Sequence, residues 1–408
     1  MSLWLKCSTL AKGFQQTRLS LLTNRQYSAF RKNQRSAVFK WVSPLRKSAD
    51  IAKQLPIHQP GQKIIGWWLA GCCGLVVGAV VLGGVTRLTE SGLSMVDWHL
   101  IKGMKPPTSQ EDWENEFNKY KQFPEFRILN HDMTLKEFKF IWYMEYSHRM
   151  WGRLIGVVYL LPLAYFWKKG WLNRGMKIKS GLLGTLLVSQ GLIGWFMVRS
   201  GLEERFADSD VPRVSQYRLA THLGSAFLLY TGMLWMSLTQ LLPKKSLNLS
   251  TTRKLVLRYH AYGLMSLVFV TALSGAFVAG LDAGLVYNSY PKMADRWIPS
   301  DLTAFTPKWL NIFENPTTVQ FDHRILGHLS LASVMSMWYM VRRSSGVHSR
   351  AILASNFMLG MAFIQVLLGV TTLLTYVPTS TAAMHQSGSL TLLSFTTWLA
   401  HELRRVPK

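Results

Sequence analysis

The chain has 408 residues, of which 49% are hydrophobic, and its formal net charge is +25. Its three cysteines exclude a disulfide framework. The excess of lysine and arginine would suit nucleic acid, but these residues flank apolar runs on one side of the predicted bundle, which is the positive-inside pattern of membrane proteins. The totals therefore predict a protein of the lipid bilayer and argue against nucleic acid as a partner.

The N-terminal segment, residues 1–53, carries eleven lysine or arginine residues against one acidic residue, Asp50, and has no long apolar run. This composition is typical of a mitochondrial transit peptide, since a secretory signal needs a continuous apolar stretch. Residues 25–28 resemble a matrix-peptidase site that is cut after Tyr27. We therefore expect a multi-pass protein of the mitochondrial inner membrane, with its N-terminus and basic loops in the matrix.

Eight apolar runs follow the basic segment. A helix of about 20 apolar residues crosses the roughly 30 Å hydrocarbon core of a bilayer, and backbone groups in that core can be satisfied only within such helices or in closed barrels. The predicted fold class is an all-α membrane protein with eight transmembrane helices. The runs lie at residues 65–85, 146–167, 179–198, 217–242, 256–280, 321–341, 352–375 and 381–400.

The first run contains the neighbouring cysteines Cys72 and Cys73. Cysteine inside a protein behaves as a small apolar residue. We expect this pair to pack between helices and not to bind a metal.

The second half of the chain repeats the first. The segment Glu145–Leu154 aligns with Gln320–Leu329 at an offset of 323 − 148 = 175 residues. The repeat predicts two pseudo-symmetric four-helix bundles, an N-terminal half at 60–245 and a C-terminal half at 253–402. The other matched segments are 190–194 with 365–369, 90–93 with 282–285, and His222 with His385.

Four histidines mark equivalent places in this repeat, one near the outer start of every second helix. We pair His148 with His222 and His323 with His385, which are 74 and 62 residues apart (222 − 148 and 385 − 323). Ionisable residues inside a membrane are costly and are functional candidates by default. Imidazole binds iron, zinc and copper, but the wide spacing without cysteine argues against zinc. A haem held between helices fits better.

Small residues stand one turn beyond each histidine, where a porphyrin plane would approach the backbone, although small residues also serve ordinary helix packing. Arg149, Arg153 and Arg324 lie near the outer interface, where a guanidinium could bind haem propionates or extend to the lipid surface. His328 takes the place of Arg153 and could contact the same ligand or only pack. The small residues are Gly152, Ala226, Gly327 and Ser389.

The two halves differ at one telling position. Glu145 precedes His148 by three residues and shares its helix face, whereas the second half has Gln320 there. A buried carboxylate could accept a proton or stabilise charge. We therefore expect the N-terminal pocket to hold the reacting porphyrin and Glu145 to be catalytic, while the C-terminal pocket holds a resident haem that passes electrons.

Together these residues resemble the mitochondrial haem A synthase family, in the segments 84–95, 145–148, 280–288 and 384–386. The resemblance extends over residues 60–402. It implies oxidation of a ring methyl of haem O to a formyl group, giving haem A for cytochrome c oxidase. It also implies haem b bound by His323 and His385, and haem O, the substrate, handled by His148 and His222.

The same resemblance implies partners. These are a matrix ferredoxin as electron donor, haem O synthase and the cytochrome c oxidase assembly machinery. Bacterial relatives carry a cysteine pair in outer loops that this chain lacks, so electrons must arrive without a thiol–disulfide step there. The sequence leaves open whether the chain forms a homo-oligomer.

Two other functions remain open from the residues alone. A bis-histidine cytochrome b would carry electrons without changing its haems, and Glu145 argues mildly against it. A haem transporter or chaperone would also suit a duplicated membrane fold.

Overall fold

The computed structural model describes residues 61–99, 104–202 and 212–405. The transit-peptide prediction for residues 1–53, with its cleavage after Tyr27, lies outside these residues. Within the described ranges the regular structure is helical, and no strand forms beyond an isolated bridge between Met293 and Arg296. The prediction of an all-α protein is therefore confirmed.

Eight long helices occupy the described residues, and each overlaps one of the eight predicted apolar runs. Short helices cover parts of the connections after α2 and α8. The long helices are α2 (Gln62–Leu88), α5 (Leu135–Lys168), α6 (Arg174–Leu202), α7 (Gln216–Leu241), α8 (Thr251–Gly280), α10 (Pro316–Arg342), α11 (Ser349–Leu374) and α12 (Thr379–Glu402). The short ones are α3 (Gln110–Tyr120), α4 (Pro124–Ile128), η3 (Ala283–Leu285), η4 (Lys308–Leu310) and α9 (Asn311–Glu314).

Five of the long helices, α2, α5, α6, α8 and α11, are long and apolar enough to cross a membrane by length and composition. Helices α7, α10 and α12 are not among these candidate spans. Serine, threonine, glutamine and histidine replace part of their aliphatic residues, and these three helices carry His222, His323 and His385. The polarity that removes them from the candidate spans thus coincides with the predicted ligands.

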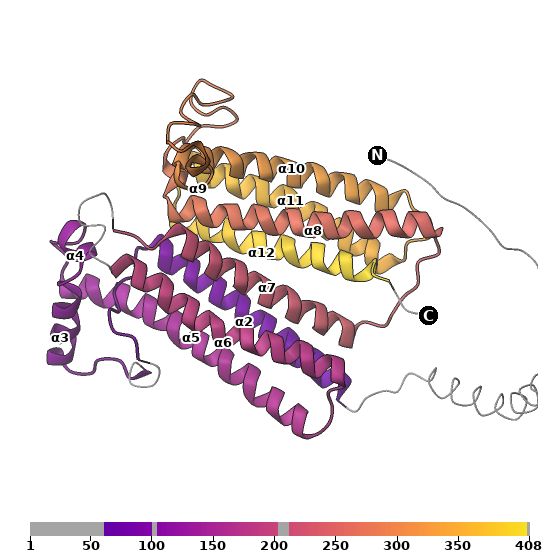
Figure 1. The fold of residues 1–408 in the computed structure, drawn as a ribbon, viewed down its shortest axis with the longest axis horizontal. Helices are drawn as coiled ribbons and strands as arrows, with labels where there is room; N and C mark the ends of the chain where they lie inside the picture. The colour runs from indigo at the N-terminus through magenta and orange to yellow at the C-terminus, as the bar shows by residue number, and fades with distance from the viewer. Residues whose placement is uncertain (1–60, 100–103, 203–211, 406–408) are drawn as a thin grey trace, which may run out of the picture. The chain divides into compact units, whose positions relative to one another are not determined.

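Helix neighbours follow the two halves of the sequence (Figure 1). In the first half α2 packs against α5 and α7, and α6 packs against α5 and α7. In the second half α8 packs against α10 and α12, and α11 packs against the same two helices. The halves meet where α7 contacts α8 and where α12 contacts α2 and α7.

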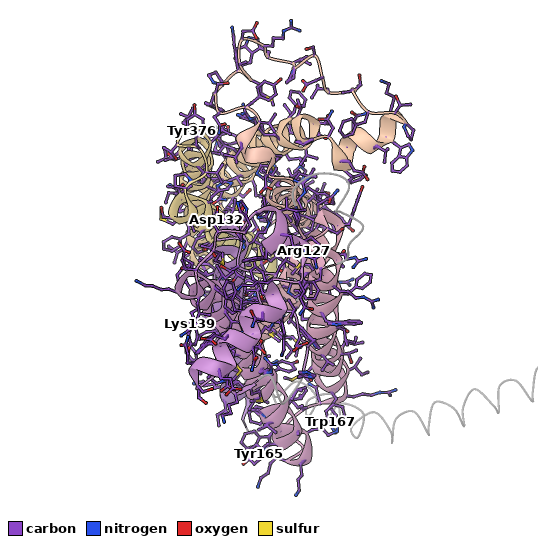
Figure 2. All side chains as sticks on the ribbon, turned by 90° about the vertical axis from the view of Figure 1, so that its left-hand side faces the viewer. Arg127, Asp132, Lys139, Tyr165, Trp167 and Tyr376 are labelled. Carbon is purple, nitrogen blue, oxygen red and sulfur yellow. The ribbon has the colours of Figure 1, made fainter. Side chains whose placement is uncertain are left out.

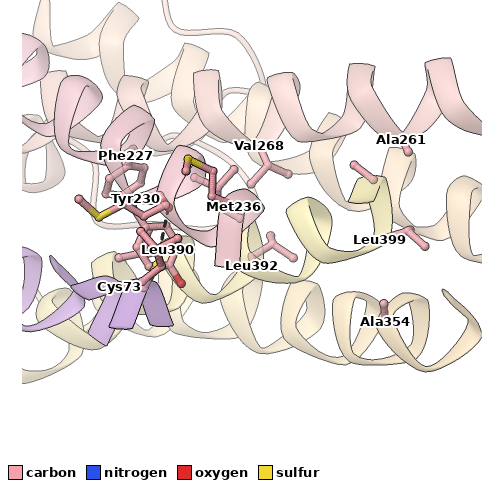
Figure 3. Packing of buried hydrophobic residues seen from close by; sticks show 14 of the residues in the cluster. Cys73, Phe227, Tyr230, Met236, Ala261, Val268, Ala354, Leu390, Leu392 and Leu399 are labelled. Carbon is pink, nitrogen blue, oxygen red and sulfur yellow. Dashed lines mark hydrogen bonds between the residues drawn. The ribbon is translucent and has the colours of Figure 1, made fainter. Parts of the chain in front are cut away.

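The main apolar core includes this junction. Cys73 of α2, Tyr230 of α7 and Leu390 of α12 are buried against one another (Figure 3). The Cys73 Sγ atom lies 3.9 Å from the Tyr230 carbonyl oxygen, and the Tyr230 hydroxyl lies 2.7 Å from Oγ of Ser394 on α12. Cys72 is also buried, so both thiols occupy packing positions as expected.

A smaller core lies between α3, α4 and the start of α5. Because Thr134 and Glu137 form a capping box, α5 begins well before its apolar run. This added stretch packs Phe138 and Trp142 against Trp113 and Phe117 of α3. Figure 2 shows the end of the molecule where α3 and α4 lie. Asp132, in the connection between α4 and α5, is labelled there.

The outward surface of the long helices is apolar. Three leucines are each more than 60% exposed: Leu161 of α5 and Leu182 and Leu192 of α6. Contiguous apolar surface of this kind is rare on soluble monomers and marks contact with a membrane or a partner. The exposed leucines and the five candidate spans together support a multi-pass membrane protein.

Candidate functional site

Each of the four predicted histidines lies with its Cε1 edge against a glycine of the neighbouring helix. A Cβ atom built on any of these glycines would fall between 2.8 and 3.3 Å from the imidazole, which is too close for an ordinary contact. The same arrangement therefore recurs at all four places, as the sequence repeat predicts. The contacts are Gly83 with His148, Gly194 with His222, Gly275 with His323 and Gly369 with His385.

The second-half pair faces ring to ring. The ring centres of His323 and His385 are 6.2 Å apart, and the ring planes are inclined by 89°. An imidazole nitrogen binds a first-row metal at about 2 Å, so two imidazoles on opposite sides of one metal have ring centres about 6 Å apart. The observed spacing suits axial ligation of a haem, which brings its own equatorial nitrogens.

The described residues contain no cluster of three or more histidine, cysteine, aspartate or glutamate side chains suited to a metal ion. A two-histidine site is insufficient for a structural zinc ion, which takes four protein ligands. Haem needs only axial ligands from the protein. The donor set therefore fits haem and not a bare metal ion.

The first-half pair has fewer polar contacts than the second-half pair. His148 and His222 lie close enough for electrostatic interaction between them. Each has a buried Nδ1 atom that finds no hydrogen-bond partner within the described part of the chain. In the second half, by contrast, Nδ1 of His323 lies 2.8 Å from Oγ of Ser274.

Glu145 is buried beneath the connection that follows α2. Its Oε1 atom accepts a hydrogen bond from Nε of Arg149 at 3.0 Å, and Oε2 accepts from the Ser94 hydroxyl and the Met95 N–H, each at 2.8 Å. Arg149 also donates to the carbonyl oxygens of Met95 at 2.7 Å and Asp97 at 3.0 Å. Nη2 of Arg149 also donates to Oε1, so four donor atoms hold the carboxylate in one position.

Gln320 and Arg324 form the same clamp in the second half. Gln320 accepts from Nη2 of Arg324 at 3.0 Å and donates to the Ala283 carbonyl oxygen at 2.8 Å. Arg324 donates to the carbonyl oxygens of Tyr287 at 2.8 Å and Ser289 at 3.0 Å. The two clamps match position for position, but only the first contains an ionisable acid.

The remaining predicted polar residues surround these clamps. Arg153 donates to the His99 carbonyl oxygen at 3.0 Å. His328 contacts the Arg324 carbonyl oxygen at 2.6 Å and the Tyr290 hydroxyl at 3.1 Å. Their predicted contact with haem propionates stays a prediction.

Two of the small residues beyond the histidines leave open space. A Cβ atom built on Gly152 or Gly327 would meet no atom within 4 Å. Space beside the backbone at these points is what a porphyrin edge would need.

A chain of contacts joins the two pairs across the junction of the halves. Gly83 touches His148, and the next residue, Gly84, lies directly against the side-chain amide of Gln386, so that a Cβ there would overlap it. Gln386 follows His385 and donates to a carbonyl oxygen of α2 at 3.0 Å. His148 of the first pair and His385 of the second pair are therefore connected through packed atoms.

A second buried carboxylate lies in α4, outside the long helices. Glu125 accepts a hydrogen bond from the Tyr120 hydroxyl at 2.9 Å, and Tyr120 in turn accepts from Asn130 at 2.8 Å. Burial, together with the nearby charges of Glu145 and Glu90, raises the pKa of Glu125 to about 8, while Tyr120 opposes the rise.

Several of these residues were not assigned a role from the sequence. Gly83 and Gly275 escaped notice because glycine is common in membrane helices, although the repeat could have indicated them: both precede matched segments by the same interval, since 275 − 83 = 282 − 90 = 192. Ser274 gave no signal, because its counterpart in the first half is Leu82.

Known proteins match the part of the chain that contains the four histidines and both clamps. Residues 66–397 match the family model described as cytochrome oxidase assembly protein. Heme A synthase COX15 of Bos taurus and of Homo sapiens are each 63% identical to this chain over 347 residues, covering 85% of it and 84% of theirs. The heme A synthase of Nitrosospira multiformis is 44% identical over 344 residues, covering 84% of this chain and 94% of its own.

Proposed function

The chain belongs to the family of cytochrome oxidase assembly proteins that includes the haem A synthases, and from this premise we propose that it makes haem A. The reaction is the oxidation of a ring methyl of haem O to a formyl group, which makes the protein an oxidoreductase. The observation that carries the proposal is the histidine–glycine contact made four times, with the second-half imidazoles 6.2 Å apart.

We assign the two pockets as follows. His323 and His385 hold a resident haem b, and His148 and His222 hold haem O as substrate. Haem between two imidazoles supplies one-electron transfer. The contacts through Gly83, Gly84 and Gln386 support a passage of electrons between the pairs.

Glu145 is the proposed catalytic residue. The clamps of the two halves are otherwise alike, so the acid in place of Gln320 distinguishes the reacting pocket from the resident one. Arg149 and the Met95 N–H hold the Glu145 carboxyl group in a fixed orientation. As a carboxylate, Glu145 can accept a proton at either oxygen when the substrate loses one.

Arg149, Arg153 and Arg324 are proposed to face the haem propionates at the outer end of each pocket. Arg324 and Arg149 are already fixed by main-chain oxygens, so their guanidinium groups are held in a defined orientation. A guanidinium that is held in place loses less freedom when a carboxylate binds to it.

The proposed architecture is eight membrane-crossing helices in two four-helix bundles, residues 60–245 and 253–402. The three more polar helices would cross by facing the pockets. The basic N-terminal segment and the five candidate spans support the mitochondrial inner membrane as location, with the N-terminus in the matrix. A ferredoxin as electron donor, haem O synthase, the oxidase assembly machinery and a homo-oligomer are proposed as partners.

A conversion assay tests the function. Purified protein in detergent would be incubated with haem O, a reductant and oxygen, and the extracted haems separated by chromatography. We expect formyl-bearing haem from the unaltered protein. An electron carrier or a haem transporter would return haem O unchanged, and that result would overturn the proposal.

The role of Glu145 is tested in the same assay. Glu145→Gln gives the first half the side chain of the second, and we expect conversion to fall by about 100-fold or more while both haems are retained. The control is Ser94→Ala, which removes one hydrogen bond to the carboxylate but keeps the acid. Normal conversion by Glu145→Gln with both haems bound would contradict the assignment.

A further inference from the structure

The two second-half imidazoles have hydrogen-bond partners that the first-half imidazoles lack. Ser274 lies 2.8 Å from Nδ1 of His323 and donates its own hydroxyl hydrogen to the Thr271 carbonyl oxygen at 2.7 Å. The serine oxygen is therefore the acceptor for an N–H at Nδ1. With its hydrogen on Nδ1, His323 carries its lone pair on Nε2, the atom left for a metal.

His385 is held from a different helix. Nε2 of Gln365 lies 3.1 Å from Nδ1 of His385 and donates to the His385 carbonyl oxygen at 2.7 Å. This approach depends on Gly388, because a Cβ at that position would overlap the Gln365 amide. Because an amide nitrogen only donates, Gln365 anchors the backbone of His385 and offers no acceptor for an N–H at Nδ1.

The first half has the same scaffold with two exchanged residues. Leu82 occupies the position of Ser274, immediately before the glycine that touches the histidine. Leucine offers no acceptor, and the buried Nδ1 of His148 has no partner among the described residues.

The second exchange places Ser225 where the other half has Gly388, three residues after the ligand. Gln190, the counterpart of Gln365, donates to the Ser225 hydroxyl at 2.7 Å. Its amide is thereby directed to the serine and not to the ring, and the buried Nδ1 of His222 is left without a partner.

We propose that Ser274 fixes the imidazole of His323, and Gln365 the backbone of His385, for permanent haem ligation. Leu82 and Ser225 withhold these contacts and make ligation by His148 and His222 exchangeable. A group that hydrogen-bonds the second nitrogen of a ligating imidazole sets its tautomer and orientation and strengthens it as a donor. The inference rests on the proposed function, which needs one haem that stays and another that enters and leaves.

Haem release tests the inference directly. Protein purified with haem b and loaded with haem O would be mixed with excess apomyoglobin as acceptor, and the haems lost over time would be extracted and separated. Removing such a partner typically weakens metal binding about 10- to 100-fold. We expect Ser274→Ala to speed haem b release by that factor, and Ser274→Thr, which keeps a hydroxyl, to restore retention.

The reciprocal exchange guards against a folding artefact. Leu82→Ser is expected to slow haem O release, which is a gain that a misfolded protein cannot give. Ser387→Ala serves as the control, because its hydroxyl bonds within its own helix, to the Ala383 carbonyl oxygen at 2.7 Å.

The midpoint potential gives a second readout. A hydrogen bond at Nδ1 makes Nε2 a stronger donor and favours ferric iron, so its loss in Ser274→Ala should shift the haem b potential upward. This inference alone would be overturned if haem bound at both pairs but Ser274→Ala changed neither haem b release nor the potential. Unchanged haem O release in Leu82→Ser would overturn it as well. Absence of haem from the unaltered protein would overturn the proposed function as well.

Discussion

The glycines that face the histidines set how closely an imidazole can lie against the next helix. At Gly369 a Cβ would come within 2.8 Å of Cε1 of His385, and real Cβ atoms are not found so close to a ring. Either the ring or the helix would have to move. The position of the His385 imidazole therefore depends on a glycine, which contributes no side chain.

Gly369→Ala is expected to displace His385 and weaken haem binding. Overpacking of this kind costs about 1–3 kcal/mol, which corresponds to a loss on the order of 10- to 100-fold in affinity. The measurement is the haem absorbance of the purified variant during dilution. Gly360→Ala is the matched control on α11, since a Cβ there meets no atom within 4 Å. Equal haem retention by both variants would show that the contact is unimportant.

At this scale the sequence predicted the histidines but not their surroundings. The four histidines were recognisable because the repeat aligned them and because polar residues are rare in apolar runs. Ser274 and Leu82 differ between the halves, so a comparison that searches for identity passes over them. Their meaning depends on the distance to Nδ1, which only the structure gives.

Among the elements, the α3–α4 segment places a buried acid beside the first clamp. Glu125 is only 4% exposed, and its pKa rises from its ordinary value of 4.5 to about 8 because burial disfavours the charge. Glu145 and Glu90 act in the same direction, whereas Tyr120 and Arg87 oppose it. The folded protein therefore keeps this proton to a higher pH than the unfolded chain does.

The pH dependence of stability follows from that difference. Between about pH 4.5 and 8 the unfolded chain loses the Glu125 proton while the folded protein retains it, so this group lowers stability as the pH rises through the window. Glu125→Gln has no proton to lose and can still accept from Tyr120. We expect it to match the parent protein near pH 4.5 and to exceed it by up to a few kcal/mol at pH 8.

Thermal unfolding in detergent at several pH values would measure this gain. Glu111→Gln, at an exposed position of α3, is the control and should show no such trend. A gain that did not grow with pH would contradict the assignment of the raised pKa to Glu125.

The elements themselves followed from the sequence to a large extent. Each predicted run overlaps a long helix, and in five of these helices length and apolarity are sufficient for crossing a membrane. The extension of α5 was not predicted, since it depends on the Thr134–Glu137 capping box and on aromatic packing against α3. The sequence analysis treated all eight runs as transmembrane helices, whereas the helices that carry His222, His323 and His385 are not among the candidate spans.

In the whole molecule, α2 and α12 bring the two halves together beside His148 and His385. Gly84 allows a close contact there, because the amide of Gln386 lies where a Cβ would be. The repeat predicted two similar halves but gave no sign of this contact, since the position equivalent to Gly84 is Ala276 and that of Gln386 is Leu223. The junction is a feature of the assembled pair and not of the repeated unit.

Gly84→Ala is expected to force the Gln386 side chain away and destabilise the junction by about 1–3 kcal/mol. The double variant Gly84→Ala/Gln386→Ala should recover most of this loss, because the shorter side chain leaves room for the new methyl group. Thermal unfolding measures both, with Gly71→Ala, where a Cβ meets nothing within 4 Å, as the control on α2. Additive losses in the double variant would refute the contact.

The paired arginine clamps have a consequence for how such a protein can diverge. Arg149 and Arg324 hold main-chain oxygens and not side chains, so the residues that supply those oxygens can change without loosening the clamp. The two halves already differ in this way, with Met95 and Asp97 in one and Tyr287 and Ser289 in the other. Beyond these anchor points the connections can lengthen or be replaced while the clamps keep their geometry.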